Sequence, residues 1–187
     1  SIAMSRTDRL ECHYELVPLD GLIVSHDVGF AFNPTLEFPE QFQPRSRNRM
    51  ADQEQVYRMA GSLVPDWLGA SSDITSGAPI VGPDYIVESG NGRVMALQAA
   101  LAGNKSSYPE YIGWLKDNAA TFGLNAEDVA RLTEGGNGYV LVRVRDTEMT
   151  KEQRINFVQR ANASAVSRYS AAETARQDAA KITDDLL

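Results

Sequence analysis

Hydrophobic positions follow two different periods along this 187-residue chain, and the clearest change of period lies near its middle. Residues 84–88 alternate from side to side as a half-buried strand does. From Val94 to Leu101 the apolar residues recur at helical spacing instead, and Gly103 with Asn104 is typical of a helix end. The pattern therefore predicts a strand, a glycine-containing turn and a helix, in that order.

Upstream of this unit the pattern predicts another helix. An apolar stripe spaced i, i+3, i+4, i+7 indicates a helix that Asp52 caps and Pro65 stops. The members of the stripe are Val56, Met59, Ala60 and Leu63. Residues 71–77 are expected to form a polar loop, and residues 79–88 a hairpin that turns at Gly82-Pro83.

Two segments of the chain, one loop and one helical insertion, are predicted to cover the core. The loop at residues 29–44 carries four aromatic residues expected to pack over it, namely Phe30, Phe32, Phe38 and Phe42. Residues 106–138 are predicted to form a helical insertion, with Asn125 and Asp128 as the cap of its second short helix. Its first apolar stripe consists of Tyr108, Tyr111, Ile112 and Leu115.

The remainder of the chain predicts one strand and C-terminal helices. Residues 139–145 have the pattern of a strand. Thr150 with Gln153, and then Ser170 with Glu173, have the spacing of capping boxes, so each pair opens a helix. No internal repeat or low-complexity tract interrupts these elements, and their mixture predicts the α+β fold class.

Candidate chemistry is concentrated at the turn Gly90-Asn91-Gly92-Arg93. Its glycines permit backbone angles closed to other residues, and free amides at the start of the following helix would face an anion. Arg93 beside them would neutralise charge on phosphoryl oxygens, which indicates hydrolysis of phosphodiesters or phosphoanhydrides. The alternative is an ordinary tight turn whose arginine is surface charge.

Three other residues are candidates for the same site. Glu88 is the nearest carboxylate in sequence, and its expected roles are orienting water or holding a metal ion. The alternative for Glu88 is a surface glutamate favoured by the helix dipole. Asn162 and Ser164 are candidates for holding phosphate or ribose, with helix-end capping as the alternative.

Two groups of arginines are candidates for contact with DNA. Arg45, Arg47 and Arg49 alternate, so an extended segment would point all three the same way. Arg143 and Arg145 share one face of the predicted strand. Such clusters can follow a phosphate backbone. The alternative is that these arginines serve solubility at a loop and an edge strand.

The composition narrows these possibilities. A net charge of −7 and a pI near 4.9 argue against a surface coated in positive charge for non-specific DNA binding. A hydrophobic content of 43% in 187 residues fits a single domain with its own core. No apolar run reaches the roughly 18 residues of a membrane span, so no membrane contact is predicted.

Cysteine and histidine usage adds two expectations. No secretory signal is visible and the single cysteine, Cys12, cannot form an internal disulfide, which agrees with a cytoplasmic location. His13 and His26 lack ligand spacing, so no protein metal site is predicted. Mg²⁺ is expected only together with a bound nucleotide such as ATP or CTP.

The order of these segments resembles the ParB/sulfiredoxin superfamily, whose central motif is a strand, a Gly-x-x-Arg turn and a helix. Residues 17–23 resemble its opening strand, Gln43-Pro44-Arg45 resembles its Gln-Pro-Arg segment, and residues 159–164 are similar to its asparagine-centred motif. The similarity spans residues 14–180 as a single domain. It implies a small mixed sheet flanked by helices, to which this chain adds the helical insertion and C-terminal helices.

Within that superfamily the chain looks most like the divergent ParB-like nuclease domains of large plasmid and phage proteins. Sulfiredoxins need a cysteine in the turn, where this chain has Asn91, so sulfiredoxin activity is not expected. Partitioning ParB proteins carry Gly-Glu-Arg-Arg and later Glu-Asn-x-x-Arg, whereas residues 90–93 and the surroundings of Asn162 differ. CTP hydrolysis in their manner is therefore not predicted.

Three functions stay open, in the following order. The first is a DNA-processing domain inside a large mobile-element protein, either a weak nuclease that cuts phosphodiester bonds or a DNA-binding module, which the arginine clusters favour. The second is a nucleotide-binding NTPase switch, which the combination of the glycine turn with Asn162 favours. The third is a catalytically inactive interaction scaffold, which the acidic balance favours.

Ser1, Ile2 and Ala3 before Met4 are typical of an expression scar. The chain is expected to be a fragment whose partners include other domains of a larger polypeptide.

Overall fold

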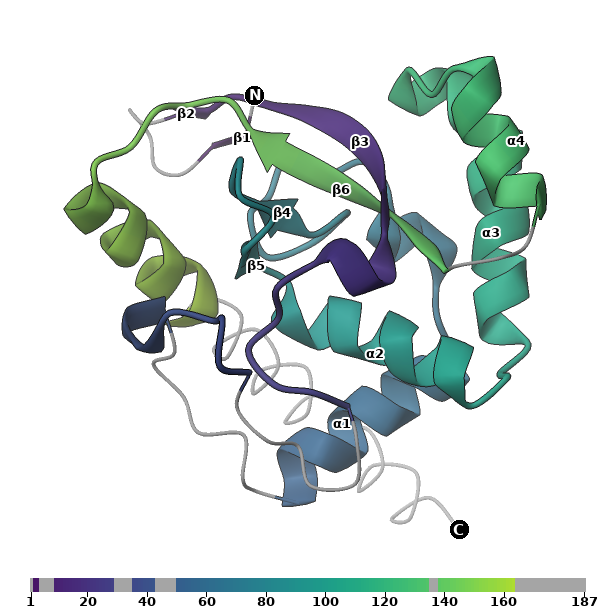
Figure 1. Ribbon diagram of the computed structural model, residues 1–187, viewed down its shortest axis with the longest axis horizontal. Helices are drawn as coiled ribbons and strands as arrows, with labels where there is room; N and C mark the ends of the chain where they lie inside the picture. The colour runs from purple at the N-terminus through teal and green to yellow at the C-terminus, as the bar shows by residue number, and fades with distance from the viewer. Residues whose placement is uncertain (1, 4–8, 29–34, 43–49, 135–137, 164–187) are drawn as a thin grey trace, which may run out of the picture.

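A four-stranded mixed sheet organises the fold (Figure 1). The computed structural model describes residues 2–3, 9–28, 35–42, 50–134 and 138–163. The strand order is β3-β6-β4-β5, formed by β3 (Cys12–Pro18), β6 (Tyr139–Arg145), β4 (Ile80–Val81) and β5 (Val87–Ser89). β6 pairs antiparallel with β3 and parallel with β4, and β4 pairs antiparallel with β5. The α+β fold class is confirmed.

Helices surround the sheet. They are α1 (Met50–Gly61), α2 (Asn91–Ala102), α3 (Ser107–Asp117), α4 (Ala126–Glu134) and a helix at residues 151–163. Four 3-10 turns lie at Leu19–Gly21, Glu40–Phe42, Pro65–Leu68 and Ala119–Phe122. In Figure 1, α1 packs on α2 below the sheet, and the helix at 151–163 lies at the opposite end of the sheet from α3 and α4. β1 (Ile2–Ala3) and β2 (Arg9–Leu10) form a separate two-stranded pair.

Several predicted elements are confirmed with their boundaries. The strand at 139–145 is β6, and the insertion contains α3 and α4. Two of the predicted caps form reciprocal bonds, the Asn125–Asp128 pair and the Thr150–Gln153 pair. Asn125 and Asp128 exchange two bonds of 3.0 and 2.9 Å between backbone amides and side-chain oxygens, and Thr150 and Gln153 exchange two of 2.9 and 3.2 Å. The predicted helix opened by Ser170 lies outside the described residues.

Three predictions about boundaries are wrong. The strand predicted at residues 84–88 is β5, which covers only Val87–Ser89, because residues 83–84 form a turn and Tyr85 has a left-handed φ of +59°. The opening strand begins at Cys12, not Val17, and it ends at Pro18 because Leu19–Gly21 turns into a 3-10 helix. Beyond that turn, Ile23 makes only an isolated parallel bridge to Ile86. Asp52 does not cap α1, which begins at Met50, but lies in its first turn, where a carboxylate complements the helix dipole.

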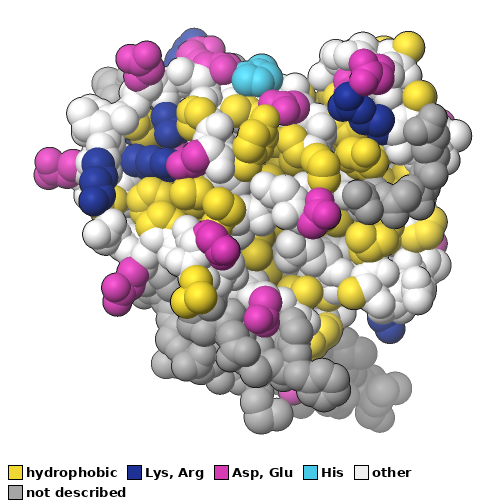
Figure 2. Space-filling model, viewed as in Figure 1, with side chains coloured by type: hydrophobic (Ala, Val, Ile, Leu, Met, Phe, Trp, Pro, Cys, Tyr) yellow, Lys and Arg dark blue, Asp and Glu magenta, His cyan; other side chains and the backbone are white. Residues whose placement is uncertain are grey.

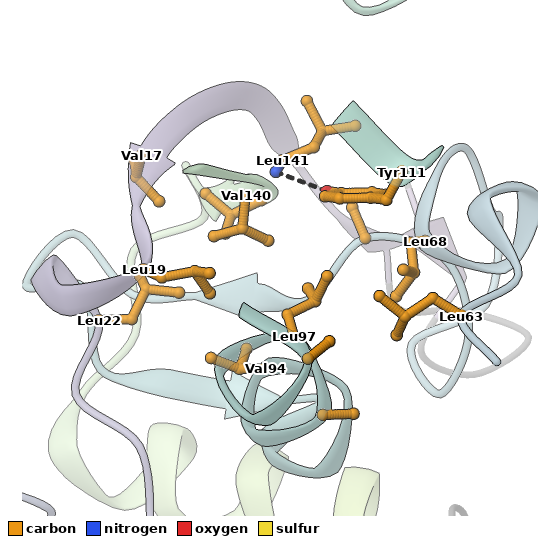
Figure 3. Close-up of a cluster of buried hydrophobic side chains, with 14 of the residues drawn as sticks. Val17, Leu19, Leu22, Leu63, Leu68, Val94, Leu97, Tyr111, Val140 and Leu141 are labelled. Atoms are coloured by element: carbon orange, nitrogen blue, oxygen red, sulfur yellow. Dashed lines mark hydrogen bonds between the residues drawn. The ribbon is translucent and has the colours of Figure 1, made fainter. Parts of the chain in front are cut away.

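The core has two parts. In the main cluster, Val94 and Leu97 of α2 face Val140 of β6, and the Tyr111 hydroxyl of α3 accepts a 3.0 Å hydrogen bond from the Leu141 amide (Figure 3). The second cluster joins the sheet to the helix at 151–163 through Leu10, Phe38, Phe42, Ile80, Phe157 and Val158. The expected packing of Phe38 and Phe42 is confirmed, whereas Phe30 and Phe32 lie outside the described residues. No helix within the described ranges is long and apolar enough to cross a membrane.

Candidate phosphate site at the glycine turn

The predicted strand, turn and helix meet at Gly90. β5 ends at Ser89 and α2 starts at Asn91, while Gly90 between them has φ +98°, a left-handed conformation that favours glycine. The Gly90 carbonyl accepts hydrogen bonds from the amides of Arg93 at 2.9 Å and Val94 at 3.0 Å. The turn thus presents the start of a twelve-residue helix, whose first amides point away from the helix and suit an anion.

Asn91 fastens the turn to the core. Its side chain is 4% exposed, its Oδ1 accepts a 2.8 Å bond from the Ser25 amide, and its Nδ2 donates to the Val87 carbonyl at 3.3 Å. The Asn91 side chain is therefore committed to the protein, and a ligand at the turn would have to be bound by backbone groups. Sequence reasoning missed Ser25, because no local pattern links it to a residue 66 positions away.

Arg93 lies inside the molecule. It is 7% exposed, and its Nη1 donates a hydrogen bond to the carbonyl of Gly77. Its guanidinium folds back over Gly90, so that a Cβ placed on that glycine would lie 2.8 Å from Nη2. This burial excludes a surface arginine at an ordinary turn. Because Gly90 has no side chain, the Arg93 guanidinium has room to lie against it.

Glu88 belongs to a group of four charges, here called the Glu88 cluster, formed by Asp84, Glu88, Arg145 and Arg154. Glu88 and Arg145 are buried, Arg154 is partly buried and Asp84 is exposed. Glu88 is fully buried, and Arg145 donates to its two oxygens at 3.0 and 3.1 Å. Arg154 donates to Glu88 at 2.6 Å and to both oxygens of Asp84 at 2.6 and 2.7 Å. The alternative of a surface glutamate is therefore wrong.

The electrostatics around Asp84 favour its charged form. Burial by itself raises the pKa of Asp84, but the hydrogen bonds and charge of Arg154 outweigh it, so that the pKa lies below its ordinary value. Arg154 also lies over the Phe42 ring, with its central carbon 5.0 Å from the ring centroid. Asn162 donates to the Phe42 carbonyl at 3.5 Å, so this residue is joined to the cluster through Phe42.

The two arginines of β6 are enclosed by the protein. Arg143 is 2% exposed and donates to carbonyl oxygens of residues 71–78, while Arg145 is 6% exposed and bonded to Glu88 and to the Thr147 carbonyl. Their contact with DNA stays a prediction. In this conformation both guanidiniums donate hydrogen bonds to oxygen atoms of the protein itself. Arg45, Arg47, Arg49 and Ser164 lie outside the described residues.

The surface charge agrees with the acidic composition. On the face in Figure 2, acidic side chains are interspersed with the basic ones and leave no broad basic surface among the described residues. Within the same residues, no three side chains of His, Cys, Asp or Glu are grouped so as to hold a metal ion. An anion placed at the turn would meet the amides at the start of α2 and the buried guanidinium of Arg93.

The architecture defines an α+β domain in which a glycine turn joins a sheet strand to a largely buried helix. A family model described as the ddrB-like ParB superfamily domain matches residues 5–146, more than half of the chain, and the chain belongs to this family. Comparisons with curated proteins and with solved structures each found no significant match. The matched residues include the turn, Glu88 and both β6 arginines, and they end before Arg154 and Asn162.

Proposed function

We propose that this domain binds DNA by holding a backbone phosphate at the glycine turn, and that it hydrolyses phosphodiester bonds there. The observation that carries the proposal is the combination of Gly90 at φ +98° with Arg93 folded against the first turn of α2. Membership of a ParB superfamily family supports a DNA-related role. The phosphate would accept hydrogen bonds from the amides of Asn91 and Gly92, with Arg93 as the counter-charge.

Each remaining candidate has a place in this proposal. Glu88 would orient the attacking water once Arg154, the more exposed of its two partners, leaves the carboxylate oxygen that it shares with Arg145. Arg45, Arg47 and Arg49 would contact neighbouring phosphates, and any Mg²⁺ would be bound mainly by phosphate oxygens and water. Arg143 and Arg145 would act on DNA only indirectly. Arg143 would act through the loop at residues 71–78, and Arg145 through the carboxylate of Glu88.

The test compares wild-type protein with Arg93→Ala and Arg131→Ala. Each variant removes one positive charge, but Arg131 is an exposed residue of α4 whose side chain pairs with Glu127. Supercoiled plasmid is incubated with each protein, with Mg²⁺ and with EDTA, and binding to a labelled duplex is measured in parallel. We expect nicking and tight binding in the wild type and in Arg131→Ala, and their loss in folded Arg93→Ala.

The outcomes separate binding from cutting. Equal nicking by all three proteins would contradict a site at the turn. Intact plasmid together with weaker duplex binding in Arg93→Ala would leave a DNA-binding domain without nuclease activity. The EDTA lane decides whether any nicking needs a divalent cation.

A second candidate function is a nucleotide-binding switch. Asn162 contacts the Phe42 carbonyl, the Phe42 ring contacts Arg154, and Arg154 contacts Glu88. These contacts join the asparagine segment to Glu88, which precedes Gly90 by two residues in the sequence. Calorimetric titration with ATP and with CTP tests this candidate, because a phosphate bound at the turn would make either titration sensitive to Arg93→Ala. Binding of neither DNA nor nucleotide would favour an interaction scaffold.

A further inference from the structure

The polar loop at residues 71–78 has a fixed shape of its own. The hydroxyls of Ser71 and Ser76 lie 2.7 Å apart, and Asp73 Oδ1 accepts bonds from the amide and hydroxyl of Thr75 at 2.6 and 2.7 Å. Gly77 has φ +75°, and a Cβ there would lie 2.5 Å from the Ser71 side chain. Such a loop can hold its carbonyl groups in defined directions.

Arg143 fills the inside of this loop. Its Nε donates to the Ala78 carbonyl at 2.7 Å, and its Nη1 donates to Ser71 and Asp73 carbonyls at 3.0 and 3.1 Å. Its Nη2 donates to the carbonyl of Ser76. One guanidinium thus binds four carbonyls along one loop, which a lysine, with its single nitrogen and three donors, cannot do.

The next carbonyl in the same loop holds the arginine of the candidate phosphate site. Arg143 donates to the carbonyl of Ser76, and Arg93 donates to the carbonyl of Gly77. The two guanidiniums therefore bind consecutive carbonyl groups of the loop. Resting on the proposed function, we propose that Arg143 is a positioning residue for Arg93, acting through residues 71–78. This loop fixes Arg93 against Gly90 before a phosphate arrives.

The physical benefit is preorganisation. A free arginine side chain loses rotamer entropy when it is ordered on a ligand. Because the Gly77 carbonyl already orders Arg93, a phosphate would find its counter-charge in place. Disturbing the loop should therefore weaken phosphate binding even though no loop residue touches the ligand.

The first measurement reads the position of Arg93 without any ligand. The side-chain Nε–Hε resonance of Arg93, assigned by its absence in Arg93→Lys, is followed by NMR in Gly77→Ala, Arg143→Lys and Gly123→Ala. Gly123 is the matched control, because its φ is +68° and a Cβ there would meet nothing within 4 Å. We expect the resonance to shift in Gly77→Ala and Arg143→Lys and to stay in place in Gly123→Ala.

The second measurement is the affinity of the same proteins for a labelled DNA duplex. Loss of an ordered charge-assisted contact should weaken binding about tenfold in Gly77→Ala and Arg143→Lys. An unmoved Arg93 resonance in either folded variant overturns the positioning role. A shifted resonance with unchanged DNA affinity supports the positioning role and contradicts the proposed phosphate site, so the two failures are distinguishable. If Arg143→Lys does not fold, Gly77→Ala alone decides.

Discussion

Three arginines that a sequence pattern leaves on the surface, Arg93, Arg143 and Arg145, are buried in this domain. Each has its donors directed at carbonyl or carboxylate oxygens, which is the condition for burying a charged group. The alternation of arginines and valines along β6 predicted the two faces of that strand. It did not reveal that both faces are covered, because the covering groups come from distant segments.

The single cysteine gives a prediction at the same scale. Burial raises the pKa of the Cys12 thiol from 9.0 to about 11, even though Arg143 acts in the opposite direction. We expect alkylation of Cys12 by iodoacetamide to be much slower in the folded protein than in urea at pH values below 9.0. The measurement is the labelling rate against pH by mass spectrometry.

The sign of the accompanying stability change follows from the raised pKa. The fold favours the protonated thiol, so its contribution is fully present below the unfolded pKa of 9.0 and is lost as pH rises toward about 11. Equal labelling rates for folded and unfolded protein below pH 9.0 would contradict the partly buried position of Cys12.

At the scale of elements, spacing predicted the existence of helices and strands better than their ends. β6 and α2 could be read from periodicity and flanking glycines. The opening strand could not, because the 3-10 turn at Leu19–Gly21 interrupts a run that is apolar enough to continue as a strand. At the site, the turn was visible in sequence, but Ser25 and the 71–78 loop were not, since their contacts are tertiary.

Two glycine substitutions test the role of the turn. Gly90→Ala should destabilise the protein by about 1–3 kcal/mol, because φ is +98° and the new Cβ would meet the Arg93 guanidinium. Gly113→Ala, inside α3 with nothing within 4 Å of its Cβ, should stabilise by about 0.5–1 kcal/mol. Urea denaturation measures both. A neutral Gly90→Ala would mean that Arg93 has room to move away at little cost.

At the scale of the whole molecule, the Glu88 cluster joins segments that are far apart in sequence. Glu88 lies in β5, the second strand of the hairpin, Arg145 ends β6, and Arg154 belongs to the helix at 151–163. With the apolar cluster around Phe42 and Phe157, these ion pairs hold that helix against the sheet. The helix at 151–163, though beyond the matched family residues, is thus part of the same core.

Removing the charge at the centre of the cluster should be costly. Glu88→Gln leaves the buried Arg145 guanidinium without its carboxylate and the partly buried Arg154 with Asp84 alone, and we expect a loss of about 3 kcal/mol in the free energy of unfolding. Glu127→Gln, which breaks an exposed pair with Arg131, should change stability by about 0.5 kcal/mol or less. Thermal denaturation of the two variants side by side makes the comparison, and similar losses would contradict a structural role for Glu88.

The central place of β6 has a consequence for the order of folding. β6 is the strand that touches both β3 and β4, yet it follows β3 by more than a hundred residues. In a nascent chain, β3 and β4 therefore lack their shared partner strand, and their apolar side chains lack its cover, until β6 has been synthesised as far as Arg145. Loop closure over that length makes assembly of this sheet slow compared with formation of its helices. A chain released before Tyr139 would contain every helix from α1 to α4 and still be unable to form the sheet.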